Sequence, residues 1–278
     1  MKKFKNLIGA LLLVFISCSD NGTQESIQEN KKLLLKSIQE ISPSSGLSTI
    51  FTYDGFKIKE VSTTGINIGP KKITYAYTGD LITQENGYVG DILYFSNEYT
   101  YENNKLKTAI SKITNGGTIF PPINETKLIY NYLPENIVEI NSYTYSFISD
   151  WEQSQFLPKV KVYFNEDNII KRETMDSDGQ IISRIDYEYD NNPNIYKNVI
   201  GFNKLFSTND YTNNFNRHFN IKDINNANNV IKFKETINGF ITESEHYNYT
   251  VNLDGYPDEK RSYWSSNQYL IEKKYTYY

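Results

Sequence analysis

A pair of aromatic residues two positions apart recurs along this chain of 278 residues, and a turn follows each pair. The stretch ITYAYTGDLITQE, residues 73–85, shows the unit: an alternating segment that ends in Tyr75 and Tyr77, then Thr-Gly-Asp, then an apolar pair. Asp, Asn and Gly are the residues that tight hairpin turns require. The first members of the pairs, with valine in one of them, are Phe51, Tyr75, Tyr99, Tyr130, Val162, Tyr187, Tyr247 and Tyr275. Such near-regular spacing indicates an internal repeat whose unit is a β-hairpin.

The two aromatic residues of a unit share one face of their strand, because residues i and i+2 of a strand point the same way. In RIDYEYD, Ile185, Tyr187 and Tyr189 share one face, and charged residues occupy the other. One apolar face and one solvated face are typical of an antiparallel sheet. The sequence therefore predicts an all-β fold, a long antiparallel meander curled into a curved sheet or incomplete barrel, with one inserted loop or short helix. The ambiguous segment KLLLKSIQEIS, residues 32–42, is interpreted as the first strand from its place in the repeat.

Residues 1–17 have the pattern of a secretory signal peptide. MKKFKN gives a basic start, and LIGALLLVFI, residues 7–16, gives an apolar core that is too short to span a bilayer. Small Ser17 directly precedes Cys18, the only cysteine. This junction resembles the lipobox that bacterial lipoprotein signal peptidase cleaves, although Phe15 stands where leucine is usual. The resemblance implies cleavage before Cys18 and acylation of its thiol and its new amino group, as with palmitate. The alternative is an ordinary signal peptide with an incidental cysteine.

The mature chain would then begin with lipidated Cys18 and a flexible polar tether, residues 18–30, and continue as one β-meander domain, residues 31–278. It would carry no free thiol, which excludes disulfides and cysteine-zinc sites. Removing three of the 29 Lys and Arg residues with the signal peptide leaves 26 against 33 Asp and Glu, so the formal charge moves from −4 to −7. An acidic chain argues against nucleic acid or anionic lipid head groups as partners.

An insertion interrupts the repeat between the pairs that begin at Tyr187 and Tyr247. Residues 191–229 are rich in Asn. Within them the apolar residues Ile195, Val199, Phe202 and Phe206 follow a helical spacing. We expect a short helix or an irregular lid that packs on the sheet. A loop of this length inside a compact domain is usually functional or poorly ordered.

Four stretches of the chain resemble a known group of proteins. FTYDGFKIKEV, YTYENNKLKTA, IDYEYDNNPNIYKNVIGFNKLF and YNYTVNLDGYPDEKRSY are similar to Tyr-Asp-type repeats of secreted Bacteroidota lipoproteins of unknown function. Those repeats are distantly similar to Rhs/YD-repeat sheets. The likeness covers most of residues 32–278. It implies the same antiparallel meander, and it carries no catalytic residues to transfer.

No catalytic or metal-binding pattern is evident in the sequence. The two histidines, His218 and His246, lack the convergent partners of a metal site or a catalytic triad. The stretch DSDG, residues 176–179, lacks the further oxygen ligands of a calcium loop and is interpreted as a hairpin turn. Asp186 and Glu188 alternate with tyrosine, which favours a solvated face with ion pairs over acid-base chemistry. We therefore predict no enzyme activity, no metal and no cofactor.

A transmembrane barrel is the less favoured architecture. The alternating segments are mostly five to seven residues long by the sequence pattern, whereas spanning strands need ~9–11 residues. The apolar face is also largely tyrosine rather than leucine or valine.

Aromatic residues in polar or inserted segments are the candidate ligand contacts. The tryptophans could stack on a sugar ring or pack on the edge of the sheet, and the insertion's aromatics could form a surface or cap the core. The candidates are Trp151, Trp264, Tyr196, Phe202 and Tyr211. The sequence predicts an outer-membrane or cell-surface lipoprotein, held at the lipid bilayer by acylated Cys18, that binds an unknown protein or glycan. The alternative is a structural or assembly component of the envelope with no small-molecule ligand.

Overall fold

The computed structural model describes residues 32–42, 46–65, 68–114, 124–146, 150–153, 159–206, 226–264 and 269–278. The predictions for residues 1–30, Cys18 included, and those for Tyr211 and His218 lie outside the described residues. The described part of the chain contains no helix long and apolar enough to cross a membrane.

Within these residues the chain forms seventeen β-strands and one short 3-10 helix. The strands are β1 (Leu35–Ile41), β2 (Gly46–Asp54), β3 (Lys57–Gly65), β4 (Ile68–Thr78), β5 (Leu81–Val89), β6 (Ile92–Glu102), β7 (Lys105–Ile113), β8 (Asn124–Leu133), β9 (Ile137–Ser146), β10 (Asp150–Gln153), β11 (Lys159–Asn165), β12 (Asn168–Met175), β13 (Ile181–Pro193), β14 (Asn228–Ile237), β15 (Phe240–Val251), β16 (Pro257–Trp264) and β17 (Tyr269–Tyr277). The 3-10 helix η1 spans Phe202–Lys204. The segment that was ambiguous in the sequence is strand β1, as expected.

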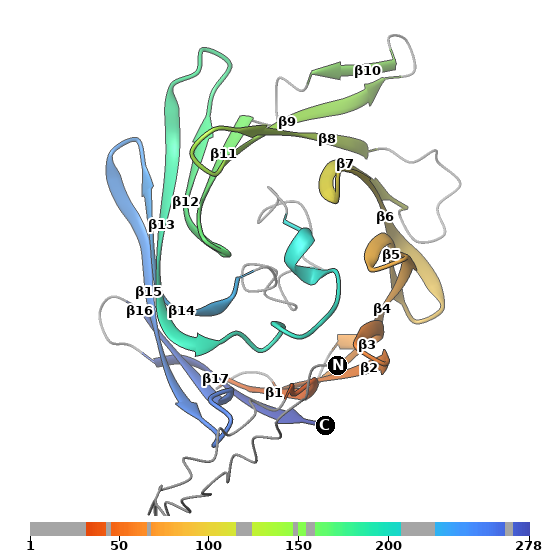
Figure 1. The fold of residues 1–278 in the computed structure, drawn as a ribbon, viewed down its shortest axis with the longest axis vertical. Coiled ribbons are helices and arrows are strands. Elements are labelled where there is room, and N and C mark those ends of the chain that lie inside the picture. Colours follow the sequence, from red (N-terminus) through yellow and green to blue (C-terminus); the bar gives the residue numbers. More distant parts are fainter. Residues whose placement is uncertain are drawn as a thin grey trace, which may run out of the picture. The chain divides into compact units, whose positions relative to one another are not determined.

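Sixteen of the seventeen described strands close into an antiparallel barrel, which Figure 1 shows as a ring. Each strand of the ring pairs with the next. The short β10 pairs with residues 143–146 of β9, while residues 137–140 of β9 pair with β11. The ring closes because β1 pairs with β2 on one side and with β17 on the other. The prediction of an all-β antiparallel meander is confirmed. The expectation of a curved sheet or incomplete barrel is corrected, because no edge of the ring is left open.

The aromatic pairs occupy alternate strands of the ring, β2, β4, β6, β8, β11, β13, β15 and β17, and face its interior. In the unit β4–β5, Tyr77 lies opposite Ile82 while Ala76 lies opposite Gln84, so one residue of the return strand bulges. The same register shift directly precedes the second aromatic residue in β2–β3, β6–β7 and β11–β12. A bulge bends its strand and increases the local twist, which helps a long sheet to close on itself.

Strand β1 supplies the return strand of the last unit. Leu35 lies opposite Tyr277 and Ser37 lies opposite Thr276, which leaves Lys36 as the bulged residue. This register equals that of β2–β3, β4–β5, β6–β7 and β11–β12. The first strand therefore completes the hairpin that the end of β17 begins.

The second tyrosine of most units replaces a backbone hydrogen bond at the end of a strand ladder. The β3–β4 ladder begins at Glu60 opposite Thr74, so the N–H of Ile58 lies beyond it. That N–H donates to the hydroxyl of Tyr77 at 3.1 Å. The other hydroxyls donate to carbonyl oxygens at equivalent positions: Tyr53 to Leu35, Tyr101 to Ile82, Tyr189 to Ile169, Tyr249 to Val230 and Tyr277 to Pro257. Tyrosine recurs at this place because buried backbone groups need partners.

Tyr77→Phe is expected to lower the free energy of unfolding by about 1–2 kcal/mol, because it removes the partner of two backbone groups. The Tyr77 hydroxyl accepts from Ile58 N–H and donates to the carbonyl of Ile200, each at 3.1 Å. Urea unfolding followed by circular dichroism measures the change. Tyr263→Phe is the control, since the Tyr263 ring stacks on His246 on the outer wall. Equal losses in the two variants would contradict the proposed role of the hydroxyl.

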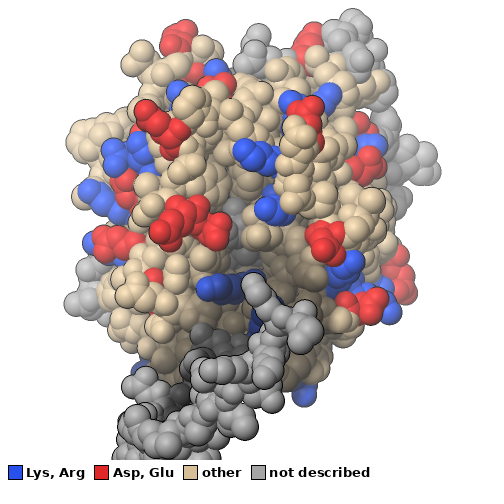
Figure 2. Space-filling model, viewed as in Figure 1, with Lys and Arg blue, Asp and Glu red and all other residues tan. Residues whose placement is uncertain are grey.

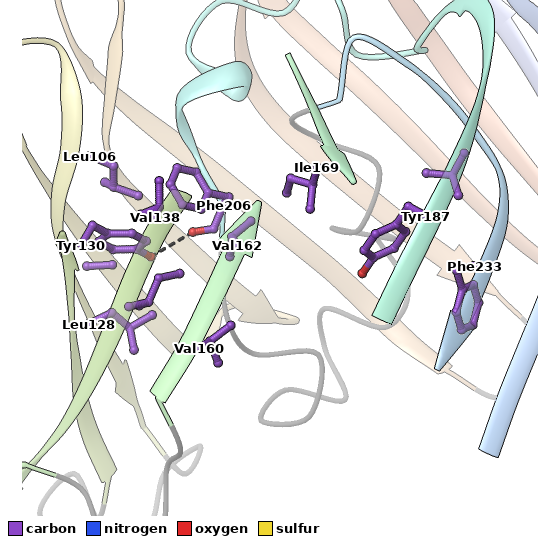
Figure 3. Packing of buried hydrophobic residues seen from close by; sticks show 13 residues of the cluster. Leu106, Leu128, Tyr130, Val138, Val160, Val162, Ile169, Tyr187, Phe206 and Phe233 are labelled. Carbon is purple, nitrogen blue, oxygen red and sulfur yellow. Dashed lines mark hydrogen bonds between the residues drawn. The ribbon is translucent and has the colours of Figure 1, made fainter. Parts of the chain in front are cut away.

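The interior of the barrel is filled with apolar side chains in two clusters. The first contains Phe51, Ile82 and Phe95, and the second contains the ten residues labelled in Figure 3. Residues 194–206, called the plug here, run from the end of β13 into this interior (Figure 1). Within the plug, the carbonyl of Phe206 accepts a hydrogen bond from the Tyr130 hydroxyl at 2.9 Å (Figure 3).

The plug matches the expectation of a short helix or irregular lid that packs on the sheet, and its apolar residues are buried. The four residues with helical spacing are buried, among them Phe202 at 2% exposure, as is the neighbouring Tyr196 at 4%. The core-capping interpretation is therefore confirmed for those two rings. The backbone forms turns and η1 instead of an α-helix. Gly201 precedes η1, and its left-handed backbone, with φ of 88°, interrupts a continuous α-helix.

The outer wall of the barrel is polar and charged. On β13 the outward residues are Arg184, Asp186 and Glu188, which confirms the solvated face predicted there. Glu188 pairs across strands with Lys232 at 2.8 Å. Further ion pairs join Lys107 to Glu102, Lys112 to Glu98 and Glu125, Lys159 to Glu139, and Arg261 to Glu259 and Glu272. Figure 2, viewed as in Figure 1, shows acidic and basic side chains interspersed over the end of the ring that faces the viewer.

The strands of the ring are 7 to 13 residues long, so the sequence estimate of five to seven residues is too short. Polar residues such as Thr and Lys continue the alternation beyond the apolar segments. Strand length therefore gives no argument against a transmembrane barrel. The charged outer wall argues against a transmembrane barrel, because a spanning barrel presents an apolar band to lipid.

Candidate functional site

The turns that follow the aromatic pairs all lie at one end of the barrel, called the plugged end here. Because neighbouring strands are antiparallel, every strand that carries an aromatic pair has its C-terminal end here. Strand β13 ends and β14 begins there, so the plug also enters from this end. Strand β1 starts there too, opposite the end of β17.

A pocket of about 370 Å³ lies at the plugged end, between the plug and the turns of three successive units. It is lined by Lys32, Phe56, Asp80, Leu81, Asn104, Lys197, Asn198, Val199, Ile200, Gly201, Asn203 and Lys204. Its walls therefore come from the start of the barrel, the first three turns and the plug. This volume lies at the lower end of the range for small-ligand sites, about 300–1,000 Å³.

The floor of the pocket is held in place by backbone contacts. The N–H of Ile200 donates to the carbonyl of Phe56 at 3.0 Å, and the Tyr77 hydroxyl donates to the carbonyl of Ile200. A Cβ at Gly201 would lie 3.0 Å from Ile82 and 3.1 Å from the Asp80 carbonyl oxygen. Glycine is therefore required at this position, both by the close approach and by the left-handed backbone.

Asn198 fixes one side of the pocket. Its amide nitrogen donates to the carbonyl of Leu33 at 2.8 Å and to the Tyr256 hydroxyl at 2.7 Å. Burial raises the pKa of Tyr256, while the hydrogen bond from Asn198 acts in the opposite direction. This amide therefore joins the plug, the segment before β1 and the turn before β16.

The asparagines around the plug serve as hydrogen-bond partners where the β13–β14 ladder is interrupted. Between Tyr189–Val230 and Pro193–Asn228 the register shifts. Asp190 accepts from the backbone N–H and the side-chain amide of Asn229 in this gap. Further contacts join Asn168 to Ala227 and Asn228, and Asn226 to Ile169. The Asn-rich composition of the insertion thus has a structural explanation in its described parts.

The charge of the pocket is opposite in sign to that of the chain. Lys32, Lys197 and Lys204 line it, and none of them pairs with an acidic side chain among the described residues. The only acidic lining residue is Asp80, which pairs with Lys57 at 3.3 Å. The chain as a whole carries a formal charge of −4. The pocket is therefore a locally basic site on an acidic protein.

Buried carboxylates inside the barrel have structural partners. Glu85 accepts hydrogen bonds from Asn97 and Tyr99, both at 2.8 Å. Burial raises the pKa of Glu85, and the hydrogen bonds from Asn97, Tyr99 and Tyr75 act against this rise. Another inward carboxylate, Glu40, pairs with Lys273 at 3.3 Å. No group of three or more His, Cys, Asp or Glu side chains in the described residues could hold a metal ion.

The two tryptophans predicted as ligand contacts do not line the pocket, whereas Tyr196 and Phe202 are buried in the plug beside residues that do. Trp151, on β10, packs against Tyr145 with ring centroids 5.5 Å apart, and Lys127 lies over its ring. Trp264, at the end of β16, is 50% exposed at the end of the barrel opposite the plug. The prediction that these tryptophans bind a ligand stays a prediction.

Sequence reasoning missed the residues that line the pocket. Phe56 follows the Asp-Gly of a hairpin turn, and 38% of it is exposed. An apolar residue directly after a turn was one available signal. Lys197 and Lys204 flank Gly201 in the insertion, but lysine in a loop is too common to indicate a site.

The sequence matches no family model and no curated protein. Two solved structures are similar in fold. A porin-like protein from Bacteroides vulgatus matches with a TM-score of 0.55 and 16% identity, over 89% of this chain and 99% of that chain. A porin-like protein from Bacteroides uniformis matches with a TM-score of 0.37 and 10% identity, over 88% of this chain and 96% of that chain. At such identities the first likeness shows the β-barrel fold alone, and the second supports no conclusion.

Proposed function

We propose that this protein is a non-enzymatic binding module of the bacterial envelope, which holds a glycan or protein partner at the plugged end of its barrel. The observation that carries the proposal is the pocket of about 370 Å³, whose floor the plug and the turns hold rigid. The similarity in fold to a porin-like protein of Bacteroides supports an outer-membrane setting.

This barrel is not suited to act as a membrane pore. Apolar side chains and the plug fill the described interior, including Phe51, Phe95 and Phe202 at 2% exposure or less. The wall carries ion pairs where a spanning barrel needs an apolar band. We therefore place the barrel beside the membrane, attached through acylated Cys18.

The anchor and the pocket are close along the chain. Thirteen residues separate Cys18 from Lys32, which lines the pocket. A fully extended chain of that length spans at most about 45 Å. A ligand at or near the membrane surface is thus within reach of the site.

Envelope pull-downs test the proposal with intact lipidated protein, Cys18→Ala, and two phenylalanine variants. Phe56→Ala removes the exposed ring at the pocket, and Phe240→Ala removes a 76% exposed ring at the opposite end. We expect Cys18→Ala to leave the membrane fraction, and Phe56→Ala alone to lose the recovered partner. Retention of Cys18→Ala in the membrane would overturn the anchor, and an intact complex with Phe56→Ala would overturn the site.

The alternative is an assembly component of the envelope without a small-molecule ligand. Exposed apolar residues at the opposite end favour it, among them Ile181, Ile241 and Trp264. Loss of a protein partner in Phe240→Ala, with Phe56→Ala unaffected, would support this alternative.

A further inference from the structure

We infer that the pocket at the plugged end binds an acidic saccharide, one whose sugar rings carry carboxylate, sulfate or phosphate groups. The inference rests on the proposed function and names the ligand class of the same site. Four observations carry it: the excess of lysine, the exposed ring of Phe56, the amide side chains, and the size of the pocket.

The lysines select for negative charge. Lys32, Lys197 and Lys204 come from two separate segments and converge on one pocket. The single lining carboxylate, Asp80, is engaged by Lys57 outside this group. The three lysines line the pocket without a paired acid in the described residues, so their positive charge favours an anionic ligand.

The remaining lining residues suit a sugar better than a simple ion. Phe56 offers an exposed aromatic face, against which the C–H face of a sugar ring can pack. Asn104 and Asn203 carry amides, which can both donate to and accept from hydroxyl groups. A free inorganic anion could accept from the lysines and the amides, but it would leave the Phe56 ring without a role.

The size of the site excludes a folded partner as the occupant of the pocket itself. A volume of about 370 Å³ accommodates a small ligand or a short stretch of a polymer. The floor limits adjustment to a larger group, since the N–H of Ile200 donates to the Phe56 carbonyl and its carbonyl accepts from the Tyr77 hydroxyl.

The acidic sugar can belong to a free polysaccharide or to the head group of a membrane glycolipid, and both present the same chemistry. Purified lipidated protein in detergent is titrated with uronate and sulfated oligosaccharides, and with neutral oligosaccharides of the same length. A parallel arm uses vesicles that contain an acidic or a neutral glycolipid. Binding in the first arm indicates a free polysaccharide, and binding in the second arm alone indicates a membrane head group.

We expect acidic ligands to bind at least tenfold more tightly than their neutral counterparts, with affinity that falls as salt rises. Lys197→Gln/Lys204→Gln should weaken acidic ligands at least tenfold. Lys59→Gln/Lys161→Gln on the outer wall is the matched control and should leave affinity unchanged. Thermal unfolding of each variant checks that the fold is intact.

Three results would overturn the inference. Equal affinity for acidic and neutral saccharides, lost in Phe56→Ala but not in the pocket lysine variant, would leave the proposed function standing with a neutral ligand. Absence of saccharide binding together with a protein partner lost in Phe56→Ala would leave a protein-binding site. Absence of any ligand or partner sensitive to Phe56→Ala would remove the proposed function as well.

Discussion

The protein is expected to unfold cooperatively as the pH rises from about 10 to 11, because its repeated tyrosines resist ionisation in the folded barrel. Burial is the largest cause of a raised pKa in five interior tyrosines. These are Tyr53, Tyr75, Tyr99, Tyr130 and Tyr277. In the unfolded chain tyrosine ionises near its ordinary pKa of about 10.

The direction of the effect follows from proton binding. Above about pH 10 the unfolded chain releases phenolic protons that the folded barrel keeps, so the unfolded state gains stability. Below that pH the stability is fully present. Each withheld proton changes the free energy of unfolding by about 1.4 kcal/mol per pH unit. Five such groups give about 7 kcal/mol per pH unit, which is comparable to the whole stability of a domain, about 5–15 kcal/mol.

Absorbance of tyrosinate and near-ultraviolet circular dichroism, recorded together against pH, measure this transition. The interior tyrosines should ionise abruptly as the dichroism is lost. A smooth titration of all tyrosines with the dichroism retained would show that the interior phenols are accessible, contrary to the structure.

Gly87→Ala is expected to destabilise the barrel by about 3 kcal/mol, the upper part of the usual range for overpacking. Gly87 on β5 lies opposite Phe95 on β6, and the fully buried Phe95 ring covers it. A Cβ on Gly87 would lie 2.0 Å from the nearest atom of that ring. The ring would have to move into a filled core.

Urea unfolding compares this variant with Gly69→Ala on β4, where an added Cβ meets nothing within 4 Å. Gly69→Ala should change stability by no more than about 0.5 kcal/mol. Gly87→Ala combined with Phe95→Leu should recover part of the loss, since leucine vacates the contested space. Similar stabilities of the two single alanine variants would contradict the packing described for Phe95.

The repeat predicted the sheet but not its closure. Tyr75 and Tyr77 indicate a strand, a face and a turn through local spacing alone, and eight such units account for the ring of sixteen strands. Closure depends on the pairing of Leu35 with Tyr277, which are far apart in the sequence. The local sequence KLLLKSIQEIS does not indicate which strand it pairs with.

The site was less predictable than the fold. Trp151 and Trp264 stood out by residue type, whereas Phe56, Lys197 and Lys204 acquire their meaning only when the plug meets the turns. The apolar spacing of the insertion correctly indicated burial. It did not indicate that the buried residues would enter a barrel and leave a pocket at its end.

The ring is sealed by the two ends of the described chain, and this has a consequence during synthesis. Strand β1 emerges from the ribosome first and β17 last, so β1 keeps an unpaired edge until the rest of the barrel is made. Exposed strand edges are sites of aggregation and of recognition by proteases and chaperones. A chain that lacked β17 would leave two such edges and could not form the seam. Closure of the barrel therefore acts as a check on completeness, made by the fold itself.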